Sequence, residues 1–154
     1  MTIATQPVLA TGHIGLNVTD LDRSRDFYQR ALGLEVQASS GDDDSRRWAF
    51  LGRDGIVQIT LWQQSDGEFS PKSPGLHHLS FQVDTIEQVR EVETTLKALS
   101  VTFTHDGVVS HGFSAPSGGV FFTDPDGIRL EVYAPTGAHD APAPSGPAPT
   151  CGFF

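Results

Sequence analysis

The chain has 154 residues, enough for one domain with a substantial hydrophobic core. Its ten Lys and Arg residues and nineteen Asp and Glu residues give a formal net charge of −9 at pH 7. We therefore expect neither nucleic acid nor an anionic membrane surface as a partner, because the chain has no positive excess to neutralise phosphates. A small neutral or cationic molecule is compatible with this charge.

Cysteine content and hydropathy restrict the chain further. The one cysteine, Cys151, excludes an intramolecular disulfide and a cysteine-rich zinc site. No stretch approaches the roughly 20 apolar residues that span a bilayer, and no basic segment followed by an apolar run opens the chain. A cytoplasmic location is the expectation.

The first half of the chain predicts a strand, a helix and three more strands. Residues 13–18 alternate polar and apolar side chains, which is typical of a half-buried strand. Asp20 or Asp22 can cap the following helix, which has an apolar stripe and ends at Gly33. The alternation and turn residues then predict strands at residues 34–38, 48–51 and 56–62, the last two joined as a hairpin.

The second half repeats this order. His-Leu-Ser-Phe-Gln-Val at residues 78–83 echoes His-Ile-Gly-Leu-Asn-Val at residues 13–18, and the strand is expected over residues 76–83. Asp84 or Thr85 caps a helix with apolar residues at helical spacing. A strand at residues 101–105, a glycine-rich loop and a hairpin with strands at residues 120–123 and 128–133 follow.

This duplication defines the expected organisation. Two βαβββ modules predict an α+β fold in which a curved mixed sheet surrounds a cavity. The Pro- and Ala-rich C-terminal tail is expected to be extended or flexible, because it has little apolar area to bury. The expected boundaries are 1–9 for an N-terminal extension, 10–64 for the first module, 65–75 for a linker, 76–135 for the second module and 136–154 for the tail.

Four polar side chains stand out on these strands: His13, Gln58, His78 and Glu131. Strand alternation places them on the polar faces, away from the faces expected to pack on helices. Imidazole and carboxylate together suit one divalent ion such as Fe(II), Mn(II), Ni(II), Co(II) or Zn(II). Two histidines and one carboxylate with open positions are the arrangement of non-haem Fe(II) oxygen chemistry. The open positions would accept adjacent oxygens of a small substrate.

The paired modules carry motifs that identify a family. They are His-Ile-Gly-Leu-Asn-Val, Phe27-Tyr28 before Leu32-Gly33-Leu34, His-Leu-Ser-Phe, and Phe-Thr-Asp-Pro-Asp-Gly at residues 122–127 leading to Leu130-Glu131. Over about residues 10–135, the chain resembles the vicinal oxygen chelate (VOC) superfamily, which includes glyoxalase I, extradiol dioxygenases, fosfomycin-resistance transferases and bleomycin-binding proteins. This resemblance implies that His13, His78 and Glu131 are metal ligands and that Gln58 holds a fourth ligand position. It also implies a homodimer whose site can draw one module from each subunit.

The resemblance implies dioxygenase-like or glyoxalase-like isomerase or lyase chemistry. In the glyoxalase pattern the fourth position carries a carboxylate, whereas Gln58 can bind a metal through its amide oxygen but cannot act as a base. Glu131 would then carry the proton transfer alone. A three-ligand site fits a dioxygenase or a transferase equally well. The alternative from another class is a metal-free, bleomycin-resistance-type protein that sequesters an antibiotic.

Further side chains near the predicted metal site are candidates for catalysis. Tyr133 and Arg129 share the face of Glu131, so they could donate to a bound oxyanion and hold an anionic group, respectively. A rim position and an ion pair with the acidic surface are the competing interpretations. His111, on the loop before the last hairpin, could act as an acid or base, or be an ordinary surface histidine.

The first module offers a candidate substrate wall. Three aromatic residues on its strands could line a cavity for an aromatic or hydrophobic substrate, with core packing as the competing interpretation. With the polar Thr60, which shares the face of Gln58, the predicted substrate-binding residues here are Trp48, Phe50, Thr60 and Trp62.

Overall fold

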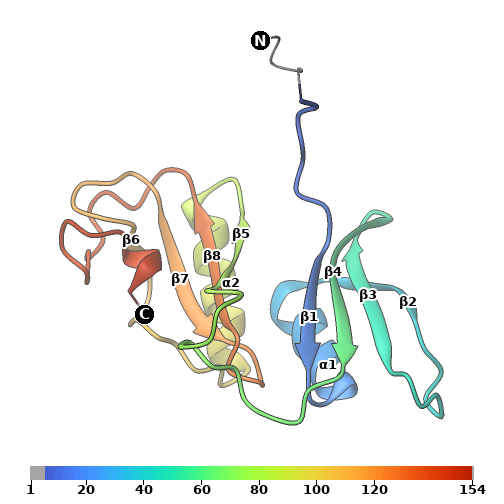
Figure 1. The fold of residues 1–154 in the computed structure, drawn as a ribbon. Coiled ribbons are helices and arrows are strands. Elements are labelled where there is room, and N and C mark those ends of the chain that lie inside the picture. The colour runs from blue at the N-terminus through green and yellow to red at the C-terminus, as the bar shows by residue number, and fades with distance from the viewer. Residues whose placement is uncertain (1–5, 154) are drawn as a thin grey trace, which may run out of the picture.

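The computed structural model describes residues 6–153. Residues 1–5 of the predicted N-terminal extension and Phe154 at the end of the tail lie outside the described residues. Figure 1 shows two modules joined by a linker, each a sheet with one helix. The first contains β1 (Ile14–Val18), α1 (Leu21–Leu32), β2 (Glu35–Ser39), β3 (Trp48–Arg53) and β4 (Ile56–Gln63). The second contains β5 (Leu79–Gln82), α2 (Ile86–Ala98), β6 (Val109–Ser110), β7 (Gly118–Thr123) and β8 (Arg129–Ala134), and the tail contains the 3-10 helix η1 (Thr150–Gly152).

The strand order is the same in both modules. The first sheet has the order β1-β4-β3-β2, and the second has β5-β8-β7-β6. In each, the first and last strands of the module pair in parallel and the other pairs are antiparallel. The predicted α+β fold of two βαβββ modules is confirmed, with each module forming its own hydrogen-bonded sheet.

The predicted strand at residues 101–105 is wrong in detail. Only Phe103 forms a bridge, to Phe122, although Thr104 N also donates to Phe121 O at 2.9 Å. The segment forms no regular strand. The strand that pairs with β7 at the edge of the second sheet is β6 at Val109–Ser110.

The helix ends follow the sequence signals. Asp20 caps α1 by accepting from Arg23 N, and Gly33 ends it in the left-handed region at φ 65°, which glycine adopts without steric cost. Thr85 and Gln88 form a capping box at the start of α2. No helix within residues 6–153 is long and apolar enough to cross a membrane.

One hydrophobic core joins the modules, and it lies on the helix-packed faces of both sheets. Tyr28 of α1 is fully buried, and its hydroxyl donates to Asp124 Oδ2 in the β7–β8 turn at 2.8 Å. The neighbouring Asp126 accepts from Thr19 N at 3.1 Å and pairs with Arg23 at 2.8 Å. The Phe-Tyr and Asp-Pro-Asp-Gly motifs therefore hold the two modules together.

The described part of the C-terminal tail folds back onto the second module, contrary to the expectation of a flexible extension. Ser110 N donates to Pro142 O at 2.7 Å, and Ala138, 1% exposed, donates its N–H to Pro116 O at 2.9 Å. In Figure 1 the tail lies against β6 and β7. Backbone hydrogen bonds, which composition does not reveal, hold this segment in place.

Candidate functional site

Glu131 is the centre of a polar cluster in the second module. The register of β5 and β8 sets Ser80 opposite Glu131, and the Ser80 hydroxyl donates to Glu131 Oε1 at 2.5 Å. The Glu131 side chain is only 4% exposed, so it needs hydrogen-bond partners to offset the loss of hydration. Ser80 was not among the predicted site residues. Its place two residues after His78, on the same strand face, is the signal that could have found it.

His111 supplies the second partner of this carboxylate. Its Nε2 lies 2.7 Å from Glu131 Oε2, and its Nδ1 lies 2.8 Å from Ser117 Oγ. An ionised carboxylate only accepts hydrogen bonds, so Nε2 must carry the proton that points at Glu131. The loop histidine is therefore a direct partner of Glu131 rather than an ordinary surface residue.

His78 approaches the other oxygen of the carboxylate. Its Nε2 lies 3.9 Å from Glu131 Oε1, which is too long for a hydrogen bond. Two ligands that each lie about 2.1 Å from one metal ion can be at most about 4.2 Å apart. The His78–Glu131 separation therefore fits a shared cation, with Ser80 and His111 orienting the carboxylate.

The electrostatics of this cluster favour the protonation states that a metal ion requires. Burial lowers the pKa of His78 despite the attraction of Glu131, which favours the neutral imidazole. Burial acts to raise the pKa of Glu131, but the hydrogen bonds from His111 and Ser80 and the nearby histidines hold it below its ordinary value. A neutral imidazole and an ionised carboxylate are the forms that bind divalent cations.

Strand register changes the assignment of the fourth position. Gly15 of β1 pairs with Thr60 of β4, as Ser80 pairs with Glu131 in the second sheet. Since residues 13–18 and 78–83 are the repeated strands, Thr60 rather than Gln58 is the equivalent of Glu131. A neutral hydroxyl, which accepts from Trp62 Nε1 at 2.9 Å, stands where the second module has its carboxylate.

Gln58 occupies a different environment. The β3–β4 register passes from Leu51–Ile59 to Gly52–Val57, which leaves Gln58 as the extra residue of a β-bulge. It lines a small pocket of 210 Å³ between the modules, together with apolar residues that include Phe81 and Val132. The structure therefore separates Gln58 from the other predicted ligands.

His13 lies on the open face of the first sheet. It is exposed just before β1, and within residues 6–153 it makes no hydrogen bond, ion pair or ring contact that would tie it to the chain. No three His, Cys, Asp or Glu side chains in the described part of the chain form a group that could hold a metal ion. One chain thus brings His78 and Glu131 together but does not complete the predicted set with His13.

The three aromatic residues of the predicted substrate wall lie on the same face as His13. Trp48 and Trp62 pair across β3 and β4, and their ring centroids lie 6.5 Å apart. Phe50 lies 4.8 Å from Trp48, and all three side chains are half-buried rather than part of the core. A Cβ added at Gly15 would meet Thr60 Oγ1 at 3.4 Å and Trp62 Nε1 at 3.5 Å, which confirms that β1 presents this face beside them.

Tyr133 and Arg129 lie on β8 but have other partners. The Tyr133 hydroxyl donates to Gln82 Oε1 at 2.7 Å, and its ring centroid lies 5.2 Å from that of His111. Arg129 Nε donates to His77 O at 3.0 Å. Tyr133 therefore borders the Glu131 cluster, and Arg129 fixes the backbone beside His78.

The C-terminal tail also borders this cluster, which the sequence did not indicate. Thr150 is fully buried; its hydroxyl donates to Ser110 O at 2.7 Å and its N–H to His111 O at 2.9 Å. Burial and the charge of Glu131 both raise the pKa of the next residue, Cys151. The tail thus holds the backbone of the loop that carries His111.

Comparison with known proteins agrees with this architecture. Residues 10–132 match the sequence profile of the Glyoxalase/Bleomycin resistance protein/Dioxygenase superfamily, so the chain belongs to this superfamily. It is 28% identical over 135 residues to a probable lactoylglutathione lyase of Vibrio cholerae, covering 82% of this chain and 91% of that protein. It is 27% identical over 126 residues to a catechol-2,3-dioxygenase of Bacillus subtilis, covering 80% of this chain but only 40% of the dioxygenase.

A solved structure supports the fold. The fosfomycin resistance protein FosX of Listeria monocytogenes, in complex with Mn(II) and a sulfate ion, has a TM-score of 0.60 and 25% identity to this chain. The similarity covers 83% of this chain and 93% of FosX. Relatives of this chain thus include enzymes of several reaction types.

Proposed function

We propose that this protein is a divalent-metal-dependent enzyme whose site is shared between two copies of the chain. In this proposal His78 and Glu131 of one copy and His13 of a second copy bind the metal ion, and a small substrate binds through adjacent oxygens. The observation that carries it is the separation of the ligands. His78 Nε2 and Glu131 Oε1 lie 3.9 Å apart, whereas His13 is exposed on the other sheet.

The donor set fits such a metal ion. Two imidazoles and one carboxylate suit Fe(II), Mn(II), Co(II), Ni(II) or Zn(II), and three protein ligands leave positions for a bidentate substrate. When bound, the metal would supply Lewis-acid or oxygen chemistry at the substrate's oxygens. The Mn(II) complex of FosX supports a metal at this fold without identifying the metal of this chain.

The absence of a carboxylate at the fourth position favours dioxygenase-like over glyoxalase-like chemistry. Thr60 stands at the position equivalent to Glu131, and a threonine hydroxyl cannot act as a base at neutral pH. Glyoxalase-like proton transfer would rest on Glu131 alone, whose oxygens already accept from Ser80 and His111. The relatives include both a catechol-2,3-dioxygenase and a probable lactoylglutathione lyase, so this choice rests on the residue at the fourth position.

The residues of this chain would then have separate tasks. Glu131 would hold the metal ion, while His111 donates to Glu131 Oε2 and keeps a proton beside the site. Ser80 fixes the rotamer of Glu131 from the neighbouring strand. The aromatic face of Trp48, Phe50 and Trp62 would pack against the apolar part of the substrate.

Metal analysis of protein purified without oxygen tests this proposal. We expect about one ion per chain in the parent protein and little in His13→Ala, His78→Ala or Glu131→Ala. His139→Ala is the matched control, because His139 is 65% exposed on the tail and lies outside the proposed ligand set. A parent protein that takes up none of the five metal ions would contradict the proposed metal-dependent enzyme and would support metal-free ligand binding.

Oxygen uptake separates the two enzyme chemistries. The Fe(II)-loaded protein is expected to consume oxygen when catechol-type substrates are added. Isomerase or lyase activity of the Ni(II)- or Co(II)-loaded protein, with no oxygen uptake by the Fe(II)-loaded protein, would favour the glyoxalase-like alternative instead.

A further inference from the structure

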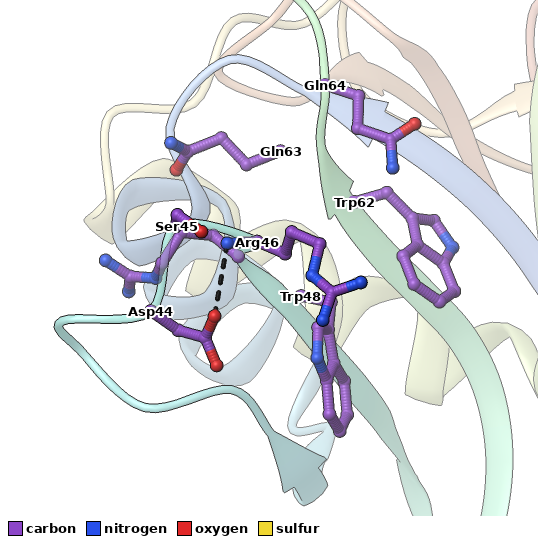
Figure 2. A pocket seen from close by; sticks show the side chains of 8 residues that line it. Asp44, Ser45, Arg46, Trp48, Trp62, Gln63 and Gln64 are labelled. Atoms are coloured by element: carbon purple, nitrogen blue, oxygen red, sulfur yellow. Dashed lines mark hydrogen bonds between the residues drawn. The ribbon is translucent and has the colours of Figure 1, made fainter.

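A second recess lies on the face of the first sheet that carries His13. It is a pocket of 540 Å³, here called the aromatic pocket, formed by residues 44–48 and 62–64 (Figure 2). This volume lies within the range of about 300–1,000 Å³ that is typical of small-molecule sites. None of its residues belongs to the proposed metal-ligand set, whereas Trp48 and Trp62 also belong to the aromatic face proposed to contact the substrate.

Two tryptophans form the apolar side of the aromatic pocket. Trp48 and Trp62 are cross-strand partners whose ring planes differ by 34°, so they offer neighbouring faces to a planar group. The Trp62 indole N–H donates to Thr60 Oγ1. Within the described residues, no hydrogen bond engages the indole N–H of Trp48.

Arg46 gives the aromatic pocket an available positive charge. Its backbone N–H donates to Asp44 Oδ1 at 3.2 Å, but its guanidinium forms no hydrogen bond or ion pair with residues 6–153. Figure 2 shows this side chain extending toward Trp48 and Trp62. The neighbouring Arg47 differs, because Asp22 binds its guanidinium at 2.8 Å.

The other polar side chains of the lining are those of Asp44, Ser45, Gln63 and Gln64. Gln63 Oε1 accepts from Leu21 N at 2.8 Å, which orients the Gln63 amide and leaves its NH₂ group as a donor. Asp44 is the carboxylate of this lining, and one of its oxygens already accepts from Arg46 N. In a chain of net charge −9, the guanidinium of Arg46 beside two indoles favours a planar ligand that carries a negative charge.

We propose that the aromatic pocket binds an aromatic carboxylate, with its ring on Trp48 and Trp62 and its carboxylate at Arg46. Asn17, the β1 partner of Trp62, lies four residues beyond His13, about 13 Å at roughly 3.3 Å per residue. The pocket would thus hold the distal, anionic end of an elongated substrate whose other end reaches the metal. The identification of this aromatic carboxylate as part of the substrate rests on the proposed function, whereas its binding to the aromatic pocket does not need a metal.

Calorimetry on the metal-free, EDTA-treated protein tests the inference with two matched probes, 2-naphthoate and its neutral analogue 2-naphthamide. We expect 2-naphthoate to bind about fivefold more tightly, as for a partly solvated ion pair. Arg46→Gln should reduce 2-naphthoate binding to the level of 2-naphthamide and leave 2-naphthamide unchanged. Trp48→Ala should weaken both, and the indole N–H signals of Trp48 and Trp62 should shift in the NMR spectrum of the parent protein when either probe binds.

Arg30→Gln is the control for net charge, because it removes the same charge from a side chain that is 62% exposed on α1. Equal affinity for the two probes, an equal effect of Arg30→Gln, or unshifted indole signals would overturn the inference. Because these measurements contain no metal, a failed metal site would leave their outcome unaffected, and a failed pocket would leave the metal analysis unaffected.

Discussion

The two modules share one strand order and one parallel register, yet they prepare different halves of the candidate site. In the second sheet, Glu131 is buried and both its oxygens are hydrogen-bonded, with His78 beside them. In the first sheet, Thr60 replaces the carboxylate and His13 stands exposed beside an aromatic face. The second module thus carries the charged half of the candidate site, and the first carries an aromatic surface.

This difference shows that two modules of one fold can supply different parts of one site. A buried carboxylate is costly unless every oxygen is satisfied, so the module that holds it is organised by hydrogen bonds before any ligand binds. The exposed His13 remains hydrated, so it has no desolvation cost to offset. In the proposed dimer it binds the metal ion only together with His78 and Glu131 of the second copy. The following changes, from the largest expected effect to the smallest, test this division.

Substitution at the equivalent positions should have unequal effects. Glu131→Gln is expected to abolish metal binding, because the amide removes the negative charge from between His78 and His111. Thr60→Ala should leave metal affinity within about threefold and instead lower the free energy of unfolding by about 1–2 kcal/mol, because the Trp62 N–H loses its partner. Equal loss of metal in both variants, measured by calorimetric titration, would contradict the asymmetry.

His111 should matter next. His111→Ala is expected to weaken metal binding by about 10–100-fold, as is usual for a group that orients a ligand. His139→Ala provides the comparison for removing an exposed histidine. An unchanged dissociation constant in a metal titration of His111→Ala would show that Glu131 needs no such support.

The contact between modules gives a stability prediction. Tyr28→Phe removes a buried donor to Asp124 and should destabilise the chain by about 1–3 kcal/mol in urea unfolding. Burial raises the pKa of Asp124 above its ordinary value of 3.8. The folded chain therefore binds this proton more tightly than the unfolded chain does, and the bound proton stabilises the fold. That favourable contribution is present below pH 3.8 and is lost as the pH rises through the raised pKa.

The destabilisation by Tyr28→Phe should therefore be larger at pH 7 than at acidic pH, because the tyrosine hydroxyl stabilises the ionised carboxylate. Tyr133→Phe is the matched control, since its hydroxyl bonds to the exposed Gln82. A Tyr28→Phe effect that is constant between acidic and neutral pH would show that Asp124 does not titrate in the folded chain.

The tail should have the smallest effect. Thr150→Val keeps the side-chain shape but removes the hydrogen bond to Ser110 O, which costs about 0.5–1.5 kcal/mol. Amide exchange in residues 110–117 should become faster, and Thr150→Ser should restore the parent rate. Unchanged exchange in Thr150→Val would mean that the tail does not hold the His111 loop.

The sequence predicted the parts of the structure that follow strand alternation and capping. His78 and Glu131 lie together as expected, because alternation sets the face of each residue and the repeat sets the order of the strands. Asp20 and Thr85, each one of the two residues that the sequence offers as a cap, begin α1 and α2. These features depend on short-range rules.

The errors arose where long-range pairing decides. Gln58 looked equivalent to Glu131 because it is the polar residue within an aliphatic strand, but the bulge after Leu51 makes Thr60 the partner of Gly15. Ser80 and the tail residue Thr150 depend on contacts 51 and 40 residues away in sequence, which no local pattern encodes. The separation of His13 from Glu131 likewise depends on how the modules pack.

A hybrid dimer tests the shared site most directly. His13→Ala and Glu131→Ala chains, carrying different affinity tags, are co-expressed, and the hybrid is isolated by sequential purification. If the site uses His13 from one copy and Glu131 from the other, each variant alone binds no metal, but one of the two sites in the hybrid is intact. The account predicts about one metal ion per hybrid dimer. A hybrid without metal, or an inability of the two chains to form one, would contradict it.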